Sequence, residues 1–266
     1  MQEQIVIDVS PGTYVSPEIF EDAKNLEREV YFSRLVSKPG LTEAEIVEYQ
    51  EFLDEFITED DEPVDNPFSE KQQRLLVSSL YSSWQLLDPK GEPRKFFATA
   101  NVGLFSRLNP TISPVVPDVM VSLDVSNRGN ITGKLPRSYM TWEFGKPPEI
   151  AVEIVSNMVG GERNGKMLKY AKIGVRYYVV FDPDENLFGD ILQVYELEGE
   201  NYRLRNDFHL PETCLRLILW QGNFEDFEDN WLRWVNEKGE LLLTADEKNA
   251  KLAEKLRELG INPNEI

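Results

Sequence analysis

Two acidic residues stand where a carboxylate is costly, at the start and in the interior of hydrophobic segments. Asp118 follows Pro117 at the start of segment 117–125, and Glu153 lies inside the apolar run 149–156. A buried carboxylate loses its hydration, so it needs a paired cation, hydrogen-bond donors or a metal ion. Two such acids on adjacent strands could hold a divalent metal, because Mg²⁺ accepts a few protein carboxylates together with water. Simpler roles are a salt bridge from Glu153 to an Arg or Lys, and a turn capped by Asp118.

A basic side chain follows in the predicted helix 162–173. The expected buried face of that helix consists of Met167, Leu168, Tyr170 and Ala171. Lys166 borders this face, where its ammonium could orient an attacking water or neutralise charge on a phosphate. The ordinary alternative is an i, i+4 ion pair between Lys166 and Glu162. Lys169 and Lys172 point further outward and are expected to lie in solvent.

The elements that would position these residues follow from hydrophobic periodicity and from helix and strand breakers. Helices are predicted at 17–37, 41–57, 69–87, 162–173 and 244–260. Strands are predicted at 96–105, 117–125, 149–156 and 175–183, a loop at 126–148, an outer hairpin at 191–204, and a hairpin or extended edge at 231–243. Thr42 with Glu45 fits a capping box, and Ser69 is expected to cap the third helix. The order helix–strand–strand–strand–helix–strand in the middle of the chain indicates a mixed α/β core.

Charge is distributed unevenly along the chain of 266 residues, whose formal net charge is −19. Residues 90–176 carry 13 basic and 7 acidic side chains, whereas residues 1–89 carry 6 and 20. The net charge argues against nonspecific binding to nucleic acid, so a polyanion would have to meet the basic middle segment. We expect three parts: an acidic helical extension at 1–66, the core at 67–220, and a C-terminal extension with a charged helix at 221–266.

Composition excludes several classes of site. Cys214 is the only cysteine, which rules out an internal disulfide and a thiolate zinc cluster. His209 is the only histidine, so serine–histidine catalysis would depend entirely on it. No segment approaches the roughly 18 apolar residues of a membrane span, and the N-terminus lacks the pattern of a secretory signal. A soluble cytoplasmic protein with no membrane partner is therefore expected.

Three segments together resemble the Uma-type family of restriction-endonuclease-like proteins, a branch of the PD-(D/E)XK nuclease superfamily. The segments are PDVMVSLDV, PPEIAVEIVS and the run ER-x-x-K-x-x-x-Y-A-x-x-GV-x-YYVVFDP. The likeness covers roughly residues 67–205 and recurs in the tail LAEKLRELGINPNEI. It implies a restriction-endonuclease-like αβββαβ core, a mixed sheet flanked by helices, with metal-binding acids on the second and third strands.

The resemblance also implies roles for individual residues. Asp118 and Glu153 match the two acids that hold Mg²⁺ or Mn²⁺ for hydrolysis of DNA phosphodiester bonds. The superfamily lysine would stand two residues after the second acid, where this chain has Val155. In this branch the matching lysine lies on the following helix and is Lys166. Glu162 stands where many relatives have an aspartate, and it is the expected accessory acid.

The expected protein is a DNA endonuclease, and a homodimer is a possible assembly. Two features differ from the family pattern or lie outside it. Relatives often carry a histidine in the first core helix, where this chain has Gln72 and Gln73. The acidic helices within 17–57 lie outside the resemblance. Two other functions remain open: a non-catalytic nucleic-acid-binding or protein-interaction module on the same fold, and an acidic interaction protein with no nucleic-acid role. The position of Lys166 Nζ relative to the two carboxylates discriminates between catalytic and non-catalytic functions.

Overall fold

The computed structural model describes residues 31, 34–35, 38, 40–54, 66–106, 114–125, 138–155, 161–185 and 190–263, except the side chains of 49–54, 142–143 and 161–164. The chain divides into two compact units, Met1–Val64 and Asp65–Ile266. In the part of the chain that the structure describes, no helix is long and apolar enough to cross a membrane.

The first unit contains helix α2 (Glu43–Asp54). The predicted capping box at its start is confirmed, because the Thr42 amide donates to Glu45 Oε2 at 2.8 Å and the Glu45 amide donates to Thr42 Oγ1 at 3.4 Å. These bonds occupy backbone donors that a helix N-terminus leaves unpaired. The predicted helix at 17–37 lies largely outside the described residues.

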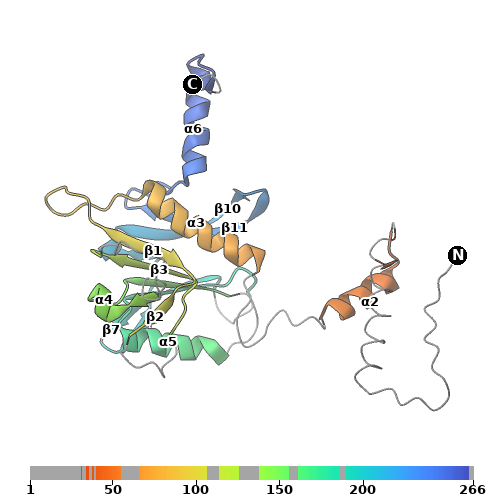
Figure 1. Cartoon of the computed structure of the whole chain (residues 1–266), viewed down its shortest axis with the longest axis horizontal. Coiled ribbons are helices and arrows are strands. Elements are labelled where there is room, and N and C mark those ends of the chain that lie inside the picture. Colours follow the sequence, from red (N-terminus) through yellow and green to blue (C-terminus); the bar gives the residue numbers. More distant parts are fainter. Residues whose placement is uncertain are drawn as a thin grey trace, which may run out of the picture. The chain divides into compact units, whose positions relative to one another are not determined.

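The second unit carries the αβββαβ core that the sequence predicts (Figure 1). Its elements are α3 (Pro67–Ser83), β1 (Phe96–Ala100), β3 (Val119–Leu123), β5 (Ile150–Ile154), α5 (Gly161–Ile173) and β6 (Tyr177–Phe181). The sheet has the order β1-β3-β5-β6-β7-β8 and is completed by β7 (Leu192–Glu198) and β8 (Asn201–Leu204). β5 and β6 run parallel, and the other neighbours run antiparallel. The predicted mixed sheet flanked by helices is therefore confirmed.

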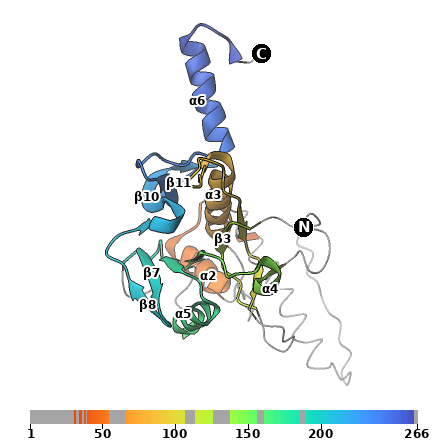
Figure 2. The same cartoon turned by 90° about the vertical axis from the view of Figure 1, so that its left-hand side faces the viewer.

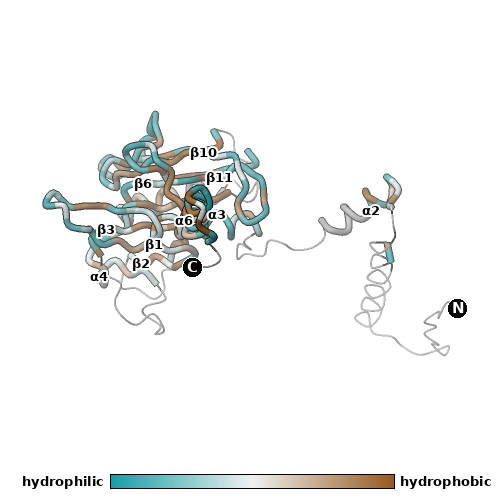
Figure 3. The backbone as a smooth tube through the Cα atoms, turned by 90° about the horizontal axis from the view of Figure 1, so that it is seen from above, coloured by the Kyte–Doolittle hydropathy of each residue, from teal (hydrophilic) through white to brown (hydrophobic). Residues whose placement is uncertain are grey.

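The central strands β3, β5 and β6 are buried along their whole length, which explains their nearly continuous apolar sequences. Alternate side chains face opposite layers, because successive residues of a strand point to opposite faces. One layer joins Val119 and Val152 to the α3 residues Leu76 and Leu80. The other layer places Tyr170 of α5 beside the sheet. Figure 1 shows α3 and α5 on opposite sides of the sheet, and Figure 3 shows the hydrophobic residues concentrated along its strands.

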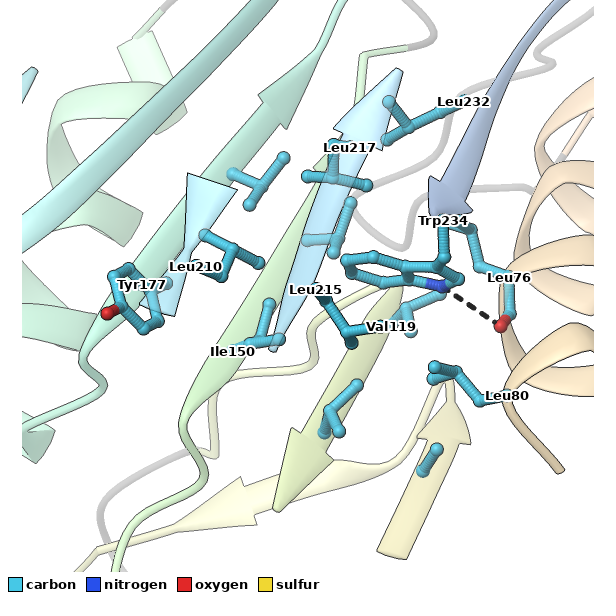
Figure 4. Packing of buried hydrophobic residues seen from close by; sticks show 14 of the residues in the cluster. Leu76, Leu80, Val119, Ile150, Tyr177, Leu210, Leu215, Leu217, Leu232 and Trp234 are labelled. Atoms are coloured by element: carbon cyan, nitrogen blue, oxygen red, sulfur yellow. Dashed lines mark hydrogen bonds between the residues drawn. The ribbon is translucent and has the colours of Figure 1, made fainter. Parts of the chain in front are cut away.

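A second sheet covers the α3 side and differs from the prediction. It has the order β11-β10-β9 and consists of β9 (His209–Leu210), β10 (Leu215–Phe224) and β11 (Phe227–Asn236). The hairpin or extended edge predicted at 231–243 is confirmed in part, because Val235 forms an antiparallel bridge with Leu241 beyond a turn at 237–238. The pairing of β11 with β10 through a turn at 225–226 was not predicted. Trp234 Nε1 donates to the Leu76 carbonyl at 3.1 Å and lies in the main core (Figure 4). The expected domain boundary after residue 220 falls within β10.

Two local expectations also need correction. The cap of α3 is Asn66, whose Oδ1 accepts the Ser69 amide at 2.8 Å, whereas Ser69 itself lies inside the helix. The single strand predicted at 96–105 is interrupted where Asn101 adopts a positive φ of 53°. The chain then continues as β2 (Gly103–Phe105), which pairs with β4 (Ser138–Met140) instead. β4 and the short helix α4 (Thr141–Phe144) occupy part of the predicted loop.

A buried ion pair anchors the C-terminal helix α6 (Ala245–Glu258) to β11. Arg233 is fully buried, and its guanidinium donates to both carboxylate oxygens of Glu247 at 2.8 and 2.9 Å. Thr244 is the N-cap of the helix and forms a capping box with Glu247. α6 has no buried residue of its own and extends away from the sheets (Figure 2). Arg233 and Glu247 therefore fix where the helix leaves the core.

Replacing Glu247 by glutamine is expected to lower the free energy of unfolding by about 1–3 kcal/mol, because buried donors of Arg233 lose a charged partner. Burial opposes ionisation, but the bonds from Arg233 and from the Thr244 amide outweigh it and hold the pKa of Glu247 below its ordinary value of 4.5. A depressed carboxyl pKa stabilises the fold above the unfolded value, and this stabilisation is lost as the pH falls through the folded value. Urea unfolding at pH 7 and pH 3 checks this. The same difference in unfolding free energy between wild type and Glu247→Gln at both pH values would contradict this pH dependence.

Candidate metal and phosphodiester site

The register of two antiparallel strands brings the two predicted acids together. Val119 of β3 lies opposite Val152 of β5. Extending this register by one residue places Asp118 opposite Glu153, so both side chains point to the face that α5 covers. Asp118 Oδ2 accepts the amide of Ile154, the residue after Glu153, at 2.6 Å. Asp118 thus bonds across the strand pair.

Glu153 is 7% exposed and receives donors from α5. Lys166 Nζ donates to its Oε2 at 2.8 Å, and the Tyr170 hydroxyl donates to its Oε1 at 2.6 Å. Burial raises the pKa of the Tyr170 phenol well above its ordinary value, and the charge of Glu153 raises it further. The phenol therefore stays protonated and remains a donor. A salt bridge and a hydrogen bond together hold the Glu153 carboxylate in one orientation.

Lys166 lies at the border between this buried carboxylate and solvent. Its side chain is 29% exposed, whereas that of Glu153 is 10% exposed. The ammonium can therefore face Glu153 and still meet a water molecule or a phosphate that approaches from solvent. Lys169 and Lys172 are exposed, as expected. Leu168 was predicted to be buried, and this is wrong, since 59% of it is exposed.

Glu162 lies in the first turn of α5, and its side chain is outside the described residues. Its predicted role as an accessory acid therefore stays a prediction. Val155 follows β5 at the position of the superfamily lysine and packs against the cluster that contains Tyr170. Among the described side chains of α5, Lys166 is the charged group that contacts Glu153.

The structure distinguishes the two glutamines of α3. Gln73 Nε2 donates to Asp118 Oδ1 at 3.1 Å, so Gln73 belongs to the site. Gln72 instead binds both backbone groups of Leu232, at 2.8 and 2.9 Å, and joins α3 to β11. Both side chains are buried, but they point from α3 in different directions and therefore have different partners.

Sequence reasoning did not assign Asn101 and Tyr170 to the site. Asn101 Nδ2 donates to Gln73 Oε1 at 2.9 Å and so supports the amide that binds Asp118. The positive φ of Asn101 turns the chain at the end of β1, and asparagine tolerates this conformation better than most residues. No sequence pattern marked that turn. Tyr170 could have been found, because it stands one helical turn after Lys166 on the same face.

Replacing Tyr170 by phenylalanine is expected to cost about 1.5–3 kcal/mol of unfolding free energy, the range for a hydrogen bond to a charged group. Chemical denaturation of the single variants Tyr170→Phe and Glu153→Gln and of the double variant measures the coupling. The cost of Tyr170→Phe should shrink when Glu153 is already neutral. Strictly additive effects would contradict a direct bond between the two side chains.

The residues present fit a divalent cation such as Mg²⁺ or Mn²⁺. Asp118 and Glu153 offer hard oxygen donors, and each carboxylate oxygen carries two lone pairs. Mg²⁺ needs only one or two carboxylates when water completes its coordination. Among the described residues no group of three His, Cys, Asp or Glu side chains gathers into a closed metal site. The donor set is therefore suited to an open cation site with water ligands.

The comparison with protein families gives a match that spans the segments of both acids. The family model Uma2, described as "Putative restriction endonuclease", matches residues 43–221. The chain belongs to the Uma2 family. The predicted resemblance is thereby confirmed, and the Uma2 match begins early enough to include α2, which we expected to lie outside it.

One solved structure is similar to this Uma2 protein at low identity. It is described as a "putative nuclease belonging to DUF820 from Anabaena variabilis ATCC 29413", with 18% sequence identity and a TM-score of 0.37. The likeness covers 55% of this chain and 71% of that chain. No curated protein matches the sequence.

Proposed function

We propose that this Uma2 protein is a metal-dependent endonuclease that hydrolyses DNA phosphodiester bonds. The observation that carries the proposal is the approach of Lys166 Nζ to Glu153, 2.8 Å from Oε2, beside a strand register that aligns Asp118 with Glu153. Membership of a family described as restriction endonucleases supports the same function. Such hydrolysis needs carboxylates that hold a metal ion and a cation that stabilises charge on the phosphate. Asp118, Glu153 and Lys166 offer these groups.

Each residue has a definite part in this proposal. Asp118 and Glu153 would hold Mg²⁺ or Mn²⁺, which supplies charge neutralisation at the phosphate and lowers the pKa of a bound water. Lys166 orients the attacking water or stabilises negative charge on the phosphate oxygens. Tyr170 and Gln73 fix the directions of the two carboxylates through their hydrogen bonds. Glu162 is proposed as an accessory acid.

DNA is the proposed partner, and the basic segment 90–176 is its proposed binding region. Lys169 and Lys172 are exposed on the helix that carries Lys166, so they are suited to contacts with backbone phosphates. Such contacts would release counterions, so DNA affinity should fall as salt rises. Assembly as a homodimer and a cytoplasmic location stay predictions.

A plasmid assay tests the function. The wild-type chain is incubated with supercoiled plasmid in Mg²⁺, in Mn²⁺ and in EDTA, beside the variant Asp118→Ala. Nicked and linear products with either metal, absent in EDTA and absent from the variant, are the expected result. Equal nicking by wild type and Asp118→Ala would mean that a contaminant or another site cleaves the DNA.

A non-catalytic nucleic-acid-binding or protein-interaction module is the second candidate, and one observation favours it. All four oxygens of Asp118 and Glu153 accept a hydrogen bond from a protein group. A pair of acids whose oxygens are all hydrogen-bonded within the protein can serve the fold alone. Metal-independent DNA binding without cleavage would support this module. Absence of both DNA binding and cleavage would leave the acidic interaction protein.

A further inference from the structure

A groove opens between α3 and the edge strand β1, next to the candidate site. Its volume is about 350 Å³. Its lining comes from one face of α3 and from the second half of β1: Glu70, Gln73, Arg74, Val77, Ser78, Ala98, Thr99 and Ala100. Pockets for small ligands run from about 300 to 1,000 Å³, so the α3–β1 groove suits a compact ligand.

One side chain belongs both to the groove and to the candidate site. Gln73 lines the groove, and its amide donates to Asp118 Oδ1 at 3.1 Å. A ligand in the groove can therefore contact Gln73, which in turn bonds Asp118, one of the two acids proposed to bind the metal. We propose that the α3–β1 groove binds the nucleotide next to the scissile phosphate. This inference rests on the proposed endonuclease function and names where its substrate is held.

The lining matches the mixed chemistry of a nucleotide. Val77, Ala98 and Ala100 give apolar walls against which a sugar or the face of a base can lie. The hydroxyl of Ser78 can donate to or accept from polar edges. Small-molecule sites commonly combine apolar walls with a few polar groups in this way.

Arg74 supplies a cation at the rim of the groove. Its guanidinium is 45% exposed and is paired through Nη2 with Glu70 and with Glu225 of the β10–β11 turn. Exposed ion pairs of this kind contribute only about 0–1 kcal/mol. A phosphate can therefore replace an acidic partner of Arg74 at little cost, and it gains the bidentate geometry that guanidinium offers.

An extended peptide is disfavoured as the occupant, although a helix beside an edge strand is a common peptide site. Such a peptide would add a strand to β1 and pair with its outward backbone groups. The Tyr81 hydroxyl already accepts the Ala98 amide at 3.0 Å and donates to the Ala98 carbonyl at 3.1 Å. An incoming strand would have to break both bonds in the middle of β1.

The test measures nucleotide binding without metal. The ¹⁵N-labelled full chain is titrated in EDTA with dAMP, dCMP, dGMP and dTMP, and separately with inorganic phosphate. Amide signals of Ser78, Thr99 and Ala100 should shift with at least one nucleotide and not with phosphate alone. No shift in the groove would overturn the inference. Shifts of the same size with inorganic phosphate as with the nucleotides would overturn it as well.

A matched pair of variants adds a second readout. Ser78→Trp places a large ring in the groove, whereas Ser82→Trp makes the same change one helical turn further along α3, outside the lining. Ser78→Trp should weaken nucleotide binding about tenfold or more, which is about 1.4 kcal/mol, while Ser82→Trp should not. Equal binding by the two would overturn the inference. If Ser78→Trp does not fold, the wild-type shifts decide.

The outcome separates this inference from the proposed function. Plasmid cleavage in Mg²⁺ without nucleotide shifts in the groove would overturn the groove assignment and leave the endonuclease. Nucleotide shifts in the groove without cleavage would overturn the endonuclease, and with it the placement beside a scissile phosphate, while a nucleotide site would remain.

Discussion

Replacing Lys166 by alanine is expected to slow DNA cleavage on the order of 10²-fold or more, the scale for a lost acid–base or electrostatic group. The side chain lies at the solvent border of Glu153, and its ammonium bonds Oε2 at 2.8 Å. Among the described side chains of α5, Lys166 is the cation that contacts Glu153, and the substitution removes it. Single-turnover cleavage with saturating enzyme measures the chemical step without the contribution of DNA affinity.

Lys169→Ala and Lys172→Ala are the matched controls, because both lysines lie on the same helix and are exposed. They should leave the single-turnover rate nearly unchanged, weaken DNA binding and reduce its salt dependence by about one charge each. Equal rate losses from all three variants would refute a special role for Lys166. A loss confined to DNA affinity in Lys166→Ala would reduce that residue to a phosphate contact.

The middle of the central sheet could be predicted because β3, β5 and β6 are nearly continuously apolar. A segment such as 175–183 admits few other structures, because Gly174 and Pro183 bound it. The β10–β11 hairpin was missed for the opposite reason. Its outer half is exposed and polar, so the alternation that marks a strand is weak there. Its turn places Glu225 and Asp226 at positive φ, and Trp234 bonds the Leu76 carbonyl of α3; neither feature is marked in the sequence.

The acids of the candidate site could be predicted, but their partners could not. Asp118 and Glu153 stand out because a carboxylate is rare in an apolar strand. The choice between Gln72 and Gln73 depends on the rotation of α3 about its axis, which packing against β11 sets. Asn101 depends on a local backbone conformation at the end of β1. Both are properties of the packed structure and leave no periodic signal.

Glu153→Gln is expected to weaken Mn²⁺ binding at least about 10²-fold, because loss of even an outer partner of a metal ligand costs 10–100-fold. The substitution keeps the size of the side chain and its ability to accept the Tyr170 hydroxyl, but it removes the negative charge. Isothermal titration of the two proteins with Mn²⁺ measures the difference. The unfolding midpoint should also rise with added metal in the wild type and not in the variant. Identical titrations would exclude Glu153 as a ligand.

Lys166→Ala provides the control that separates metal binding from catalysis. The ammonium of Lys166 competes with a cation for Glu153 Oε2, so its removal should leave Mn²⁺ affinity unchanged or increase it. The two variants are therefore expected to move metal affinity in different directions while both lower the cleavage rate. Had the Lys166–Glu153 pair served the fold alone, neither variant would alter Mn²⁺ binding, and both would act only on the unfolding midpoint.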